Sequence, residues 1–506
     1  MFIIIRKYTL AERHLKKAGG EIDIMVRELG KPVYIKAILL LVFFSFVFLG
    51  AEYLFDNMMA YVTDSGSVVR AQGYILGVSV IGFLLYPAAN RFIKKNNRMQ
   101  MLFALTLMAV VCLFAVQQHI SYSMILIPGM VLFLILGFCG SAVHYMAVCM
   151  IPGGKYLARM AGISYAFGIL LQFLNNNLIN VELVEAMILS IFLSAIVVLV
   201  FQTEKELEGK EEAKEGIPEE NPKEESKLPV TAGIIFAVIV ALMACVFATL
   251  DNAVTLVHAA GSVDIGQWPR LLLACSGLLA GFLFDIRERK LMNIMMYCVM
   301  LLSTICVTVI EFGGPFLAGL IAFYLSAGFF AVFFTVGFME LSYSMKMPDL
   351  WAGLGRAVNN ACAVVTTHIS AALLSTGNII IIMIVALVLF AAISVVMYVY
   401  AWKLQPEIKE EVTNEAEKER EKFPEFAAAF SLTKREQEVL QCLLTSDDSI
   451  QNIAEQLMMS RAALYRHIGN LNDKTDTKSR IGLMQFYYAW DSDKYALNAD
   501  RKNEGE

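Results

Sequence analysis

Charged residues are scarce in this 506-residue chain: Asp, Glu, Lys and Arg make up 17% of it, whereas hydrophobic types make up 58%. Soluble domains contain about 25% charged and roughly 45–50% apolar residues, so the composition excludes an ordinary soluble globular protein. The charges concentrate in the N-terminal segment, a central loop and roughly the last hundred residues. The apolar blocks between them approach the ~20 residues that a helix needs to cross a bilayer.

Three further patterns are missing. The nine cysteines show no disulfide or metal-ligand spacing, so we interpret them as small apolar side chains. The N-terminal segment, 1–32, lacks the compact apolar core and small-residue cleavage site of a signal peptide. No nucleophile constellation, phosphate-binding loop or metal-ligand set is visible. The sequence therefore predicts neither an enzyme nor a bound cofactor.

Twelve apolar blocks have the length of membrane-spanning helices. Their predicted ranges are 33–54, 68–89, 99–118, 122–148, 157–176, 181–202, 229–250, 266–285, 291–311, 315–340, 350–374 and 378–402. The sequence therefore predicts an all-α fold, with a twelve-helix bundle in a lipid bilayer and a soluble C-terminal segment.

Lys and Arg are absent from every second connection between these spans, namely 55–67, 119–121, 177–180, 251–265, 312–314 and 375–377. The other connections and the N-terminal segment carry them. Because cytoplasmic loops are enriched in Lys and Arg, the basic connections and both chain termini are predicted to be cytoplasmic. This indicates a multi-pass protein of the inner (cytoplasmic) membrane, with its C-terminal segment on the side where DNA lies.

A charged loop, 203–228, divides the spans into two halves, 33–202 and 229–402. The loop is rich in Glu and Lys and has no apolar run, which predicts a solvated linker. The halves also echo one another, because Asp56-Asn57 and Asp251-Asn252 follow the first span of each half at an offset of 195 residues. A repeat of six spans is typical of two-halved transporter folds.

The segment Gly281–Lys290 (GFLFDIRERK) resembles the G-x-L-x-D-R-x-G-R-K motif of the major facilitator superfamily, and departs from it at Ile286 and Glu288. The first half keeps a degraded copy in which Asn90 replaces the Asp. The resemblance covers roughly residues 33–402 and implies a facilitator-like bundle. The alternative interpretation is a basic juxtamembrane loop that follows the positive-inside rule.

Beyond the spans, residues 403–427 are rich in Glu, Lys and Arg, and like and opposite charges roughly cancel at helical spacing. We expect a frayed helical or flexible tether there. It leads to a folded segment, 428–490, which a polar tail, 491–506, follows.

The folded segment contains the signals of a helix-turn-helix unit. Thr433 with Glu436 forms a capping box that opens a helix, and Ser460 is the N-cap of a later one. The predicted buried stripes are Val439, Leu440, Leu443, Ile453, Ala454, Leu457, Leu464, Ile468 and Leu471. The helix that Ser460 caps then presents Arg461, Tyr465 and Arg466 on its outer face, where they fit the major groove of double-stranded DNA.

Residues 432–483 closely resemble the LuxR/GerE-type DNA-binding domain, a four-helix helix-turn-helix module. The matching residues are Leu432, Thr433, Arg435, Glu436, Glu438, Val439, Leu440, Ile453, Ala454, Leu457, Ser460, Leu464, His467, Asn470, Leu471, Lys474, Ser479, Arg480 and Leu483. The resemblance implies that Tyr465 and Arg466 read bases, that His467 and Lys474 lie near phosphates, and that the helix at about 479–490 carries a dimer contact. Two departures are Ala463, which lacks a hydroxyl, and Thr475, which we expect to weaken a core contact.

The charge of this segment leaves a second interpretation open. Residues 434–490 are close to neutral, so a helical bundle that has lost DNA binding, or that binds protein, is the alternative. Cations do concentrate between 460 and 480, which favours one groove contact and a homodimer for useful affinity. The candidate DNA-binding residues are Arg461, Tyr465, Arg466, His467, Lys474 and Arg480.

Polar residues within the spans are candidates for a small-molecule site, because they are costly in a bilayer. The candidate ligand-binding residues are Asp56, Asn57, His144, Asn176, Asp251, Asn252, Asn359 and His368. Solvation near a span end explains Asp56, Glu52, Arg70 and Arg270 equally well. For the two histidines, satisfied interior hydrogen bonds are the favoured explanation. We expect Arg159, Asp285 and Arg356 at the cytoplasmic edge, where they tie helices and loops together.

Three functions remain open at this point. The first is a membrane-embedded one-component transcriptional regulator, in which the bundle senses a small molecule and the C-terminal domain binds DNA. The second is an active secondary transporter with a regulatory tail, and the third is a transporter whose tail binds protein. A sequence-reading helix has little use in transport, so the sequence favours the regulator.

Overall fold

The computed structural model describes residues 25–179, 181–214, 230–259, 267–311, 316–375, 379–445 and 450–490. Within these ranges the chain is helical and contains no strand, which confirms the all-α prediction. The chain divides into two compact units, Met1–Ala401 and Trp402–Glu506.

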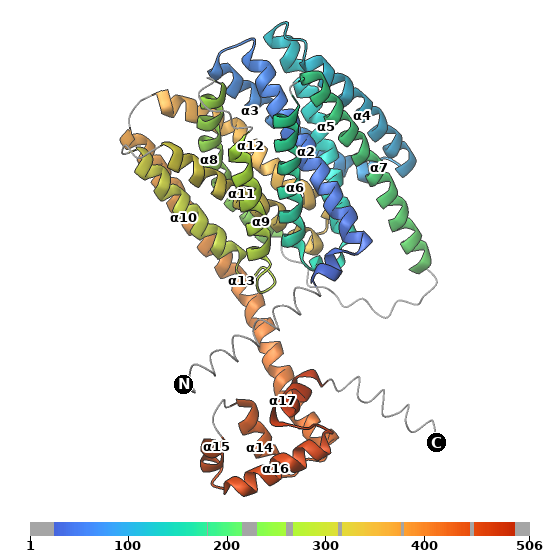
Figure 1. The fold of residues 1–506 in the computed structure, drawn as a ribbon, viewed down its shortest axis with the longest axis vertical. Helices are drawn as coiled ribbons and strands as arrows, with labels where there is room; N and C mark the ends of the chain where they lie inside the picture. The colour runs from blue at the N-terminus through green and yellow to red at the C-terminus, as the bar shows by residue number, and fades with distance from the viewer. Residues whose placement is uncertain are drawn as a thin grey trace. The chain divides into compact units, whose positions relative to one another are not determined.

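Twelve helices of the described chain correspond one to one to the twelve predicted spans. They are α2 (Pro32–Ala60), α3 (Ser65–Phe92), α4 (Lys95–Val116), α5 (Tyr122–Met150), α6 (Leu157–Leu178), α7 (Glu182–Lys214), α8 (Val230–Ala259), α9 (Trp268–Phe284), α10 (Met292–Glu311), α11 (Phe316–Ser344), α12 (Pro348–Ser375) and α13 (Ile379–Ala429). A short 3₁₀ turn, η1 (Pro152–Gly154), precedes α6. In Figure 1 the first six helices, blue to green, fill one side of the bundle, and most of the later ones fill the other.

Eight of these helices, α2 to α8 and α11, contain stretches long and apolar enough to cross a membrane. Shorter apolar stretches lie in α9, α10 and α13. In the described chain α12 is in neither group, and it carries Asp349, Arg356, Asn359 and Asn360 along its first half. Unit 1 is therefore a membrane bundle in which one helix is conspicuously polar.

The two halves of the bundle meet where α3 packs on α12 and α6 packs on α9. At the second contact Gly162 faces Gly281, the first residue of the facilitator-like motif. A Cβ atom on Gly162 would lie 2.6 Å from the Cα of Gly281, which is closer than non-bonded carbon atoms approach. Only glycine at both positions allows this backbone contact.

Asp285, in the same motif, ties the halves together. Its carboxylate accepts the backbone N–H groups of Ala158 (3.2 Å) and Arg159 (2.9 Å) at the start of α6, and an N–H of Arg289 (3.1 Å). Arg289 also donates to Glu340 at 2.9 Å. In the degraded copy the amide of Asn90 donates to Asp349 at 3.1 Å. Arg159 and Asp285 thus tie helices together as the sequence predicts.

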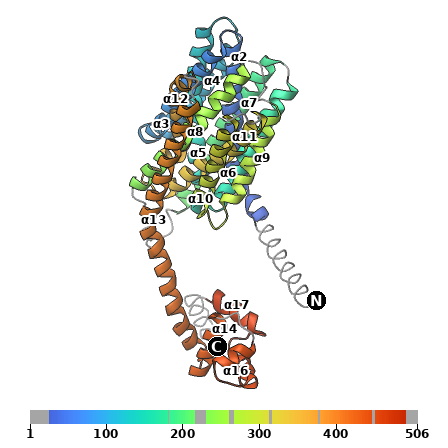
Figure 2. The ribbon, with the colours of Figure 1, turned by 90° about the vertical axis from the view of Figure 1, so that its left-hand side faces the viewer.

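The C-terminal unit begins within α13, which runs as one helix from Ile379 to Ala429 (Figure 2). Four shorter helices follow: α14 (Lys434–Thr445), α15 (Ile450–Gln456), α16 (Arg461–Lys474) and α17 (Arg480–Ala489). The predicted stripe residues of α14, α15 and α16 are buried, except Leu457, which is half-buried. A helical backbone therefore occupies 403–427, where the sequence predicted a frayed helix or a flexible tether.

Candidate nucleic-acid interface and membrane cavity

The turn between α15 and α16 fixes the direction of α16. Ser460 caps the helix by accepting the N–H of Ala463 at 3.2 Å. Before it, the N–H of Met459 reaches the carbonyl of Ala454 at 2.9 Å, while Met458 adopts a left-handed φ of 49°. Leu464, Ile468 and Leu471 then face the core. This is the short helix, tight turn and second helix of a helix-turn-helix unit.

The outer face of α16 presents Tyr465 and Arg466 to solvent. Tyr465 is 60% exposed, and Arg466 is also exposed. Neither side chain has a hydrogen-bond or ion-pair partner among the described residues. A phenol and a guanidinium held on a rigid helix are able to reach base edges or phosphates in a major groove.

Two other candidate DNA-binding residues hold the domain together. Arg461 donates to Gln451 on α15. The ammonium of Lys474 donates to the carboxylate of Glu436 at 2.7 Å and to the carbonyl of Ser431 at 2.8 Å. Arg461 at the start of α16 and Lys474 at its end therefore each have structural partners. A role of either residue in DNA contact stays a prediction.

The remaining candidates flank the helix. His467 is half-buried and its Nδ1 has no hydrogen-bond partner in the described chain. Arg480 is half-buried at the start of α17. Thr475 was expected to weaken the core, but its buried hydroxyl donates to the carbonyl of Leu471 at 2.7 Å. The hydrogen bond compensates for the burial of this polar group.

Glu436 is the electrostatic centre of the domain and is only 3% exposed. The backbone N–H and the hydroxyl of Thr433 donate to its carboxylate at 2.8 and 2.9 Å, which confirms the predicted capping box. Burial alone would raise the pKa of Glu436, but the hydrogen bond from Lys474 and those from Thr433 lower this pKa to about 2. The carboxylate is therefore ionised at neutral pH and joins α14 to the end of α16.

Sequence reasoning missed an aromatic cluster at the end of α13. The ring of Phe426 is fully buried and lies 5.1 Å from the ring of Tyr487 and 5.3 Å from that of Trp490. Phe430 packs on Phe486 of α17 at 5.5 Å. The signal was present as aromatic residues at helical spacing just before the capping box. All members of this hydrophobic core lie within residues 423–490, so we expect this segment to fold alone.

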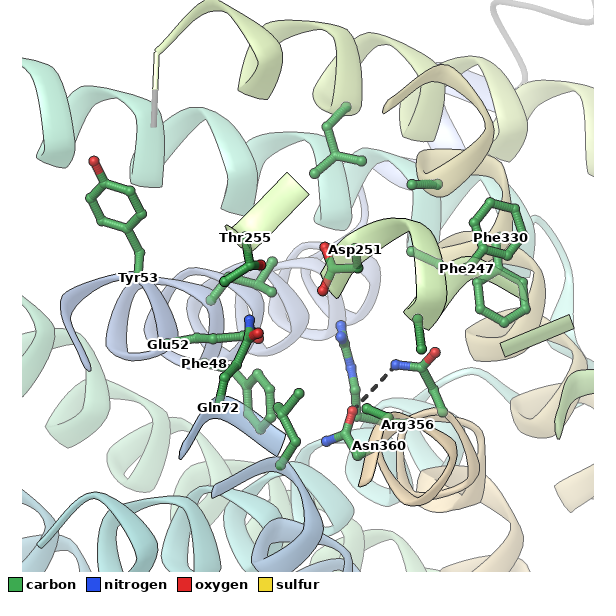
Figure 3. A pocket seen from close by; sticks show the side chains of 18 of the residues that line it. Phe48, Glu52, Tyr53, Gln72, Phe247, Asp251, Thr255, Phe330, Arg356 and Asn360 are labelled. Atoms are coloured by element: carbon green, nitrogen blue, oxygen red, sulfur yellow. Dashed lines mark hydrogen bonds between the residues drawn. The ribbon is translucent and has the colours of Figure 1, made fainter. Parts of the chain in front are cut away.

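The membrane unit contains a central cavity of about 160 Å³. Three of the candidate ligand-binding residues line it: Asp56 from α2, Asp251 from α8, and Asn359 from α12. The two aspartates are the residues of the 195-residue repeat, so the repeat places one carboxylate from each half in the cavity. Figure 3 shows the side chains of Glu52, Asp251 and Arg356 reaching into the same space.

Four of the other candidates are described by the structure and are not among the residues that line this cavity. The oxygen of Asn57 lies 3.1 Å from a ring nitrogen of His258, Asn252 is buried with its oxygen 3.5 Å from the hydroxyl of Thr367, and the amide of Asn176 lies 3.1 Å from Glu185. His144 hydrogen-bonds to the carbonyl of Gly140 at 2.7 Å and lines a smaller adjacent cavity. The side chain of His368 lies outside the described residues.

Arg356 corrects one expectation from the sequence. It was placed at the cytoplasmic edge, but it lines the central cavity, about two helical turns inside α12. Glu52, Gln72 and Arg270 also line the cavity. Glu52 precedes Asp56 by one helical turn, and this i,i+4 spacing of two carboxylates was the available signal for a shared face.

Comparison with known proteins gives each unit a class. Residues 430–487 match the family described as bacterial regulatory proteins, luxR family. A solved auto-inhibited peptide transporter of the POT family is 12% identical, with a TM-score of 0.50, over 73% of this chain and 97% of that one. A mutant of the nucleoside transporter NupG (12% identity, TM-score 0.44, 72% and 98% covered) and a double-tryptophan mutant of XylE (12%, 0.48, 73% and 94%) are also similar. No curated protein gives a significant match.

These findings confirm both resemblances. The C-terminal segment is a LuxR-type helix-turn-helix domain, and the membrane unit has the fold of a major facilitator-type transporter. At 12% identity the second likeness establishes the fold alone.

Proposed function

We propose that this protein is a membrane-embedded one-component transcriptional regulator, in which a facilitator-like bundle binds a small molecule and a LuxR-type domain binds double-stranded DNA. The observation that carries the proposal is the exposed, unpartnered pair Tyr465 and Arg466 on α16, inside the segment that matches the luxR family. A helix that presents such residues to a groove serves no step of solute transport.

The distribution of Lys and Arg supports a location in the inner membrane with both termini in the cytoplasm. In this orientation the LuxR-type domain meets DNA without leaving the membrane protein to which it is joined.

The proposed mechanism is a shift between bundle conformations. A ligand that binds one conformation more tightly raises its population. Because α13 belongs to both units as one helix, a change in its membrane segment is passed covalently to the DNA-binding domain. The near-neutral charge of this domain makes a single copy a weak binder, so the output is the availability of a homodimer.

DNA capture from membrane fractions tests the proposal. We expect the full-length protein to enrich specific DNA fragments, and Arg466→Ala to abolish the enrichment because it removes the free guanidinium. Lys434→Ala, an exposed cation on α14, is the matched control and should bind DNA almost as well. No enriched DNA, or equal enrichment with Arg466→Ala, would contradict the regulator.

The cavity lined by polar residues of both halves favours a second candidate, an active secondary transporter with a regulatory tail. Solute uptake into proteoliposomes that persists after deletion of 426–506 would support it. Absence of uptake, together with DNA binding, would support the regulator.

A further inference from the structure

The central cavity gathers charges of both signs. Glu52 and Asp56 project from α2 and Asp251 from α8, while Arg270 comes from α9 and Arg356 from α12. Three carboxylates and two guanidinium groups therefore surround one space of about 160 Å³.

These opposite charges do not neutralise one another in ion pairs. The guanidinium of Arg356 lies between the rings of Phe48 and Phe334, 5.3 Å from each centroid, and that of Arg270 lies 6.0 Å from the ring of Tyr53. Neither arginine has an ion-pair or hydrogen-bond partner within the described ranges. Aromatic faces attract a cation but leave its N–H groups unused.

The carboxylates likewise have few hydrogen-bond partners among the described residues. Asp56 is only 5% exposed, and its Oδ1 has no hydrogen-bond partner in the described chain. Glu52 accepts one hydrogen bond, from Gln72 at 3.0 Å. Several ions elsewhere in the bundle are paired, as Arg98 is with Glu204 and Arg289 with Glu340.

Unmatched ions inside a membrane bundle are costly and mark sites where a ligand supplies the missing partners. An anion alone would satisfy the guanidinium groups and leave the carboxylates unmatched. A cation alone would do the reverse. A solute that carries both charges satisfies both sets at once.

The size and walls of the cavity narrow the class further. A cavity of about 150 Å³ holds a molecule the size of benzene, so a space of about 160 Å³ suits a small solute. Phe247 and Phe330 stack at 4.5 Å along one wall, and Phe48 lies on another. These surfaces suit an apolar side chain on the solute.

We propose that the central cavity binds a zwitterionic solute the size of a free amino acid with an apolar side chain, with Arg356 and Arg270 facing its carboxylate and Asp56, Glu52 and Asp251 facing its ammonium group. This inference names the solute for the sensing role that we propose for the bundle. Binding of the solute does not depend on DNA. Only the effect of the solute on DNA binding rests on the proposed function.

The test uses the purified full-length protein in lipid nanodiscs. Thermal shift and calorimetry are recorded with L-phenylalanine, L-leucine and L-methionine, each beside its amide, which keeps only the positive charge, and its N-acetyl derivative, which keeps only the negative charge. We expect at least one free amino acid to bind at least roughly thirtyfold more tightly than both of its derivatives, because each derivative leaves one set of buried ions unmatched.

Two cavity variants and one control complete the test. Asp56→Asn and Arg356→Gln should each weaken binding of that amino acid roughly thirtyfold or more. Glu185→Gln alters a buried carboxylate outside the cavity, hydrogen-bonded to Asn175, and should leave the affinity unchanged. The comparison of free amino acid with derivatives needs no variant, so a variant that fails to fold leaves the test intact.

The idea is overturned if none of the free amino acids binds, or if an amide or N-acetyl derivative binds as well as its parent. This outcome is distinct from failure of the proposed regulator. Amino-acid binding without any DNA capture would remove the regulator and keep the inference, whereas DNA capture without amino-acid binding would do the opposite.

Discussion

Two buried carboxylates of this protein, one in each unit, have opposite surroundings. In the C-terminal domain Glu436 is 3% exposed and receives hydrogen bonds from Lys474 and Thr433. In the membrane unit Asp56 is 5% exposed and has an oxygen with no partner among the described residues. Removing the partner of a matched buried ion destabilises the fold, whereas an unmatched buried ion already raises the free energy of the folded state unless a ligand binds.

The two interiors differ in packing as well. The C-terminal domain closes its core with an aromatic cluster around Phe426, whereas the bundle leaves a cavity of about 160 Å³ at its centre. The packed core of the C-terminal domain holds α16 in place, whereas the cavity of the bundle leaves room for a ligand. The comparison predicts that substitutions in the first interior cost stability, and that substitutions in the second cost binding.

The largest effect is expected for Phe426→Ala in a soluble fragment that covers residues 416–490. The buried ring contacts Tyr487 and Trp490, and its loss should lower the free energy of unfolding by about 3–5 kcal/mol. Urea unfolding followed by circular dichroism measures it. Tyr465→Ala removes an exposed ring of similar size and should change stability by no more than about 0.5 kcal/mol. Equal effects of the two changes would contradict the closed core.

Lys474→Met should cost about 2–4 kcal/mol at neutral pH, because Glu436 loses its cation while it stays buried. The same urea experiment measures it, with the exposed Lys434→Met as control.

The pH dependence of unfolding distinguishes loss of the Lys474–Glu436 ion pair from loss of packing. The pKa of Glu436 is about 2 in the folded domain, below its ordinary value of 4.5. The contribution of ionised Glu436 to the free energy of unfolding is therefore complete above pH 4.5 and is lost as the pH falls from 4.5 toward 2. Lys474→Met should flatten this part of the profile, because the folded-state pKa of Glu436 then rises toward its ordinary value. A profile parallel to that of the unaltered fragment would argue against the ion pair.

In the cavity, replacing a buried charged residue is expected to raise stability rather than lower it. Arg356→Met replaces an unmatched guanidinium with an apolar side chain that fits between Phe48 and Phe334. Without ligand the full-length protein should become more stable by about 1 kcal/mol, seen as a higher melting temperature in nanodiscs. The control is Arg289→Met, which breaks the pairs with Asp285 and Glu340 and should lower the melting temperature. A loss of stability with Arg356→Met would show that this arginine supports the fold.

The sequence predicted the elements better than the cavity, for a physical reason. Hydrophobic length marks a span, and short-range caps such as Thr433 with Glu436, or Ser460 with Ala463, depend on neighbours three residues apart. Both signals are local in the chain, so the twelve helices and the helix-turn-helix unit were predicted from them.

The cavity depends on packing between helices far apart in the sequence. The repeat identified Asp56 and Asp251, but nothing local distinguishes them from Asn57 and Asn252, which point to other partners. Arg356 was assigned to an edge because a basic residue near a loop usually lies there. Only the polar composition of α12 indicated that this helix faces a solvated or charged interior.

The smallest expected effect concerns the turn that directs α16. Met458 has a left-handed φ of 49° and its side chain is 92% exposed, so the residue contributes backbone strain and almost no packing. Glycine adopts this conformation without a Cβ clash. Met458→Gly should therefore stabilise the fragment by about 0.5–1 kcal/mol, reduced by the extra freedom of glycine in the unfolded chain. Met459→Gly, at a half-buried position without a positive φ, is the matched control and should destabilise it. If both changes destabilise the fragment equally, the turn is not strained, and packing in the core alone has to hold α16 in its orientation.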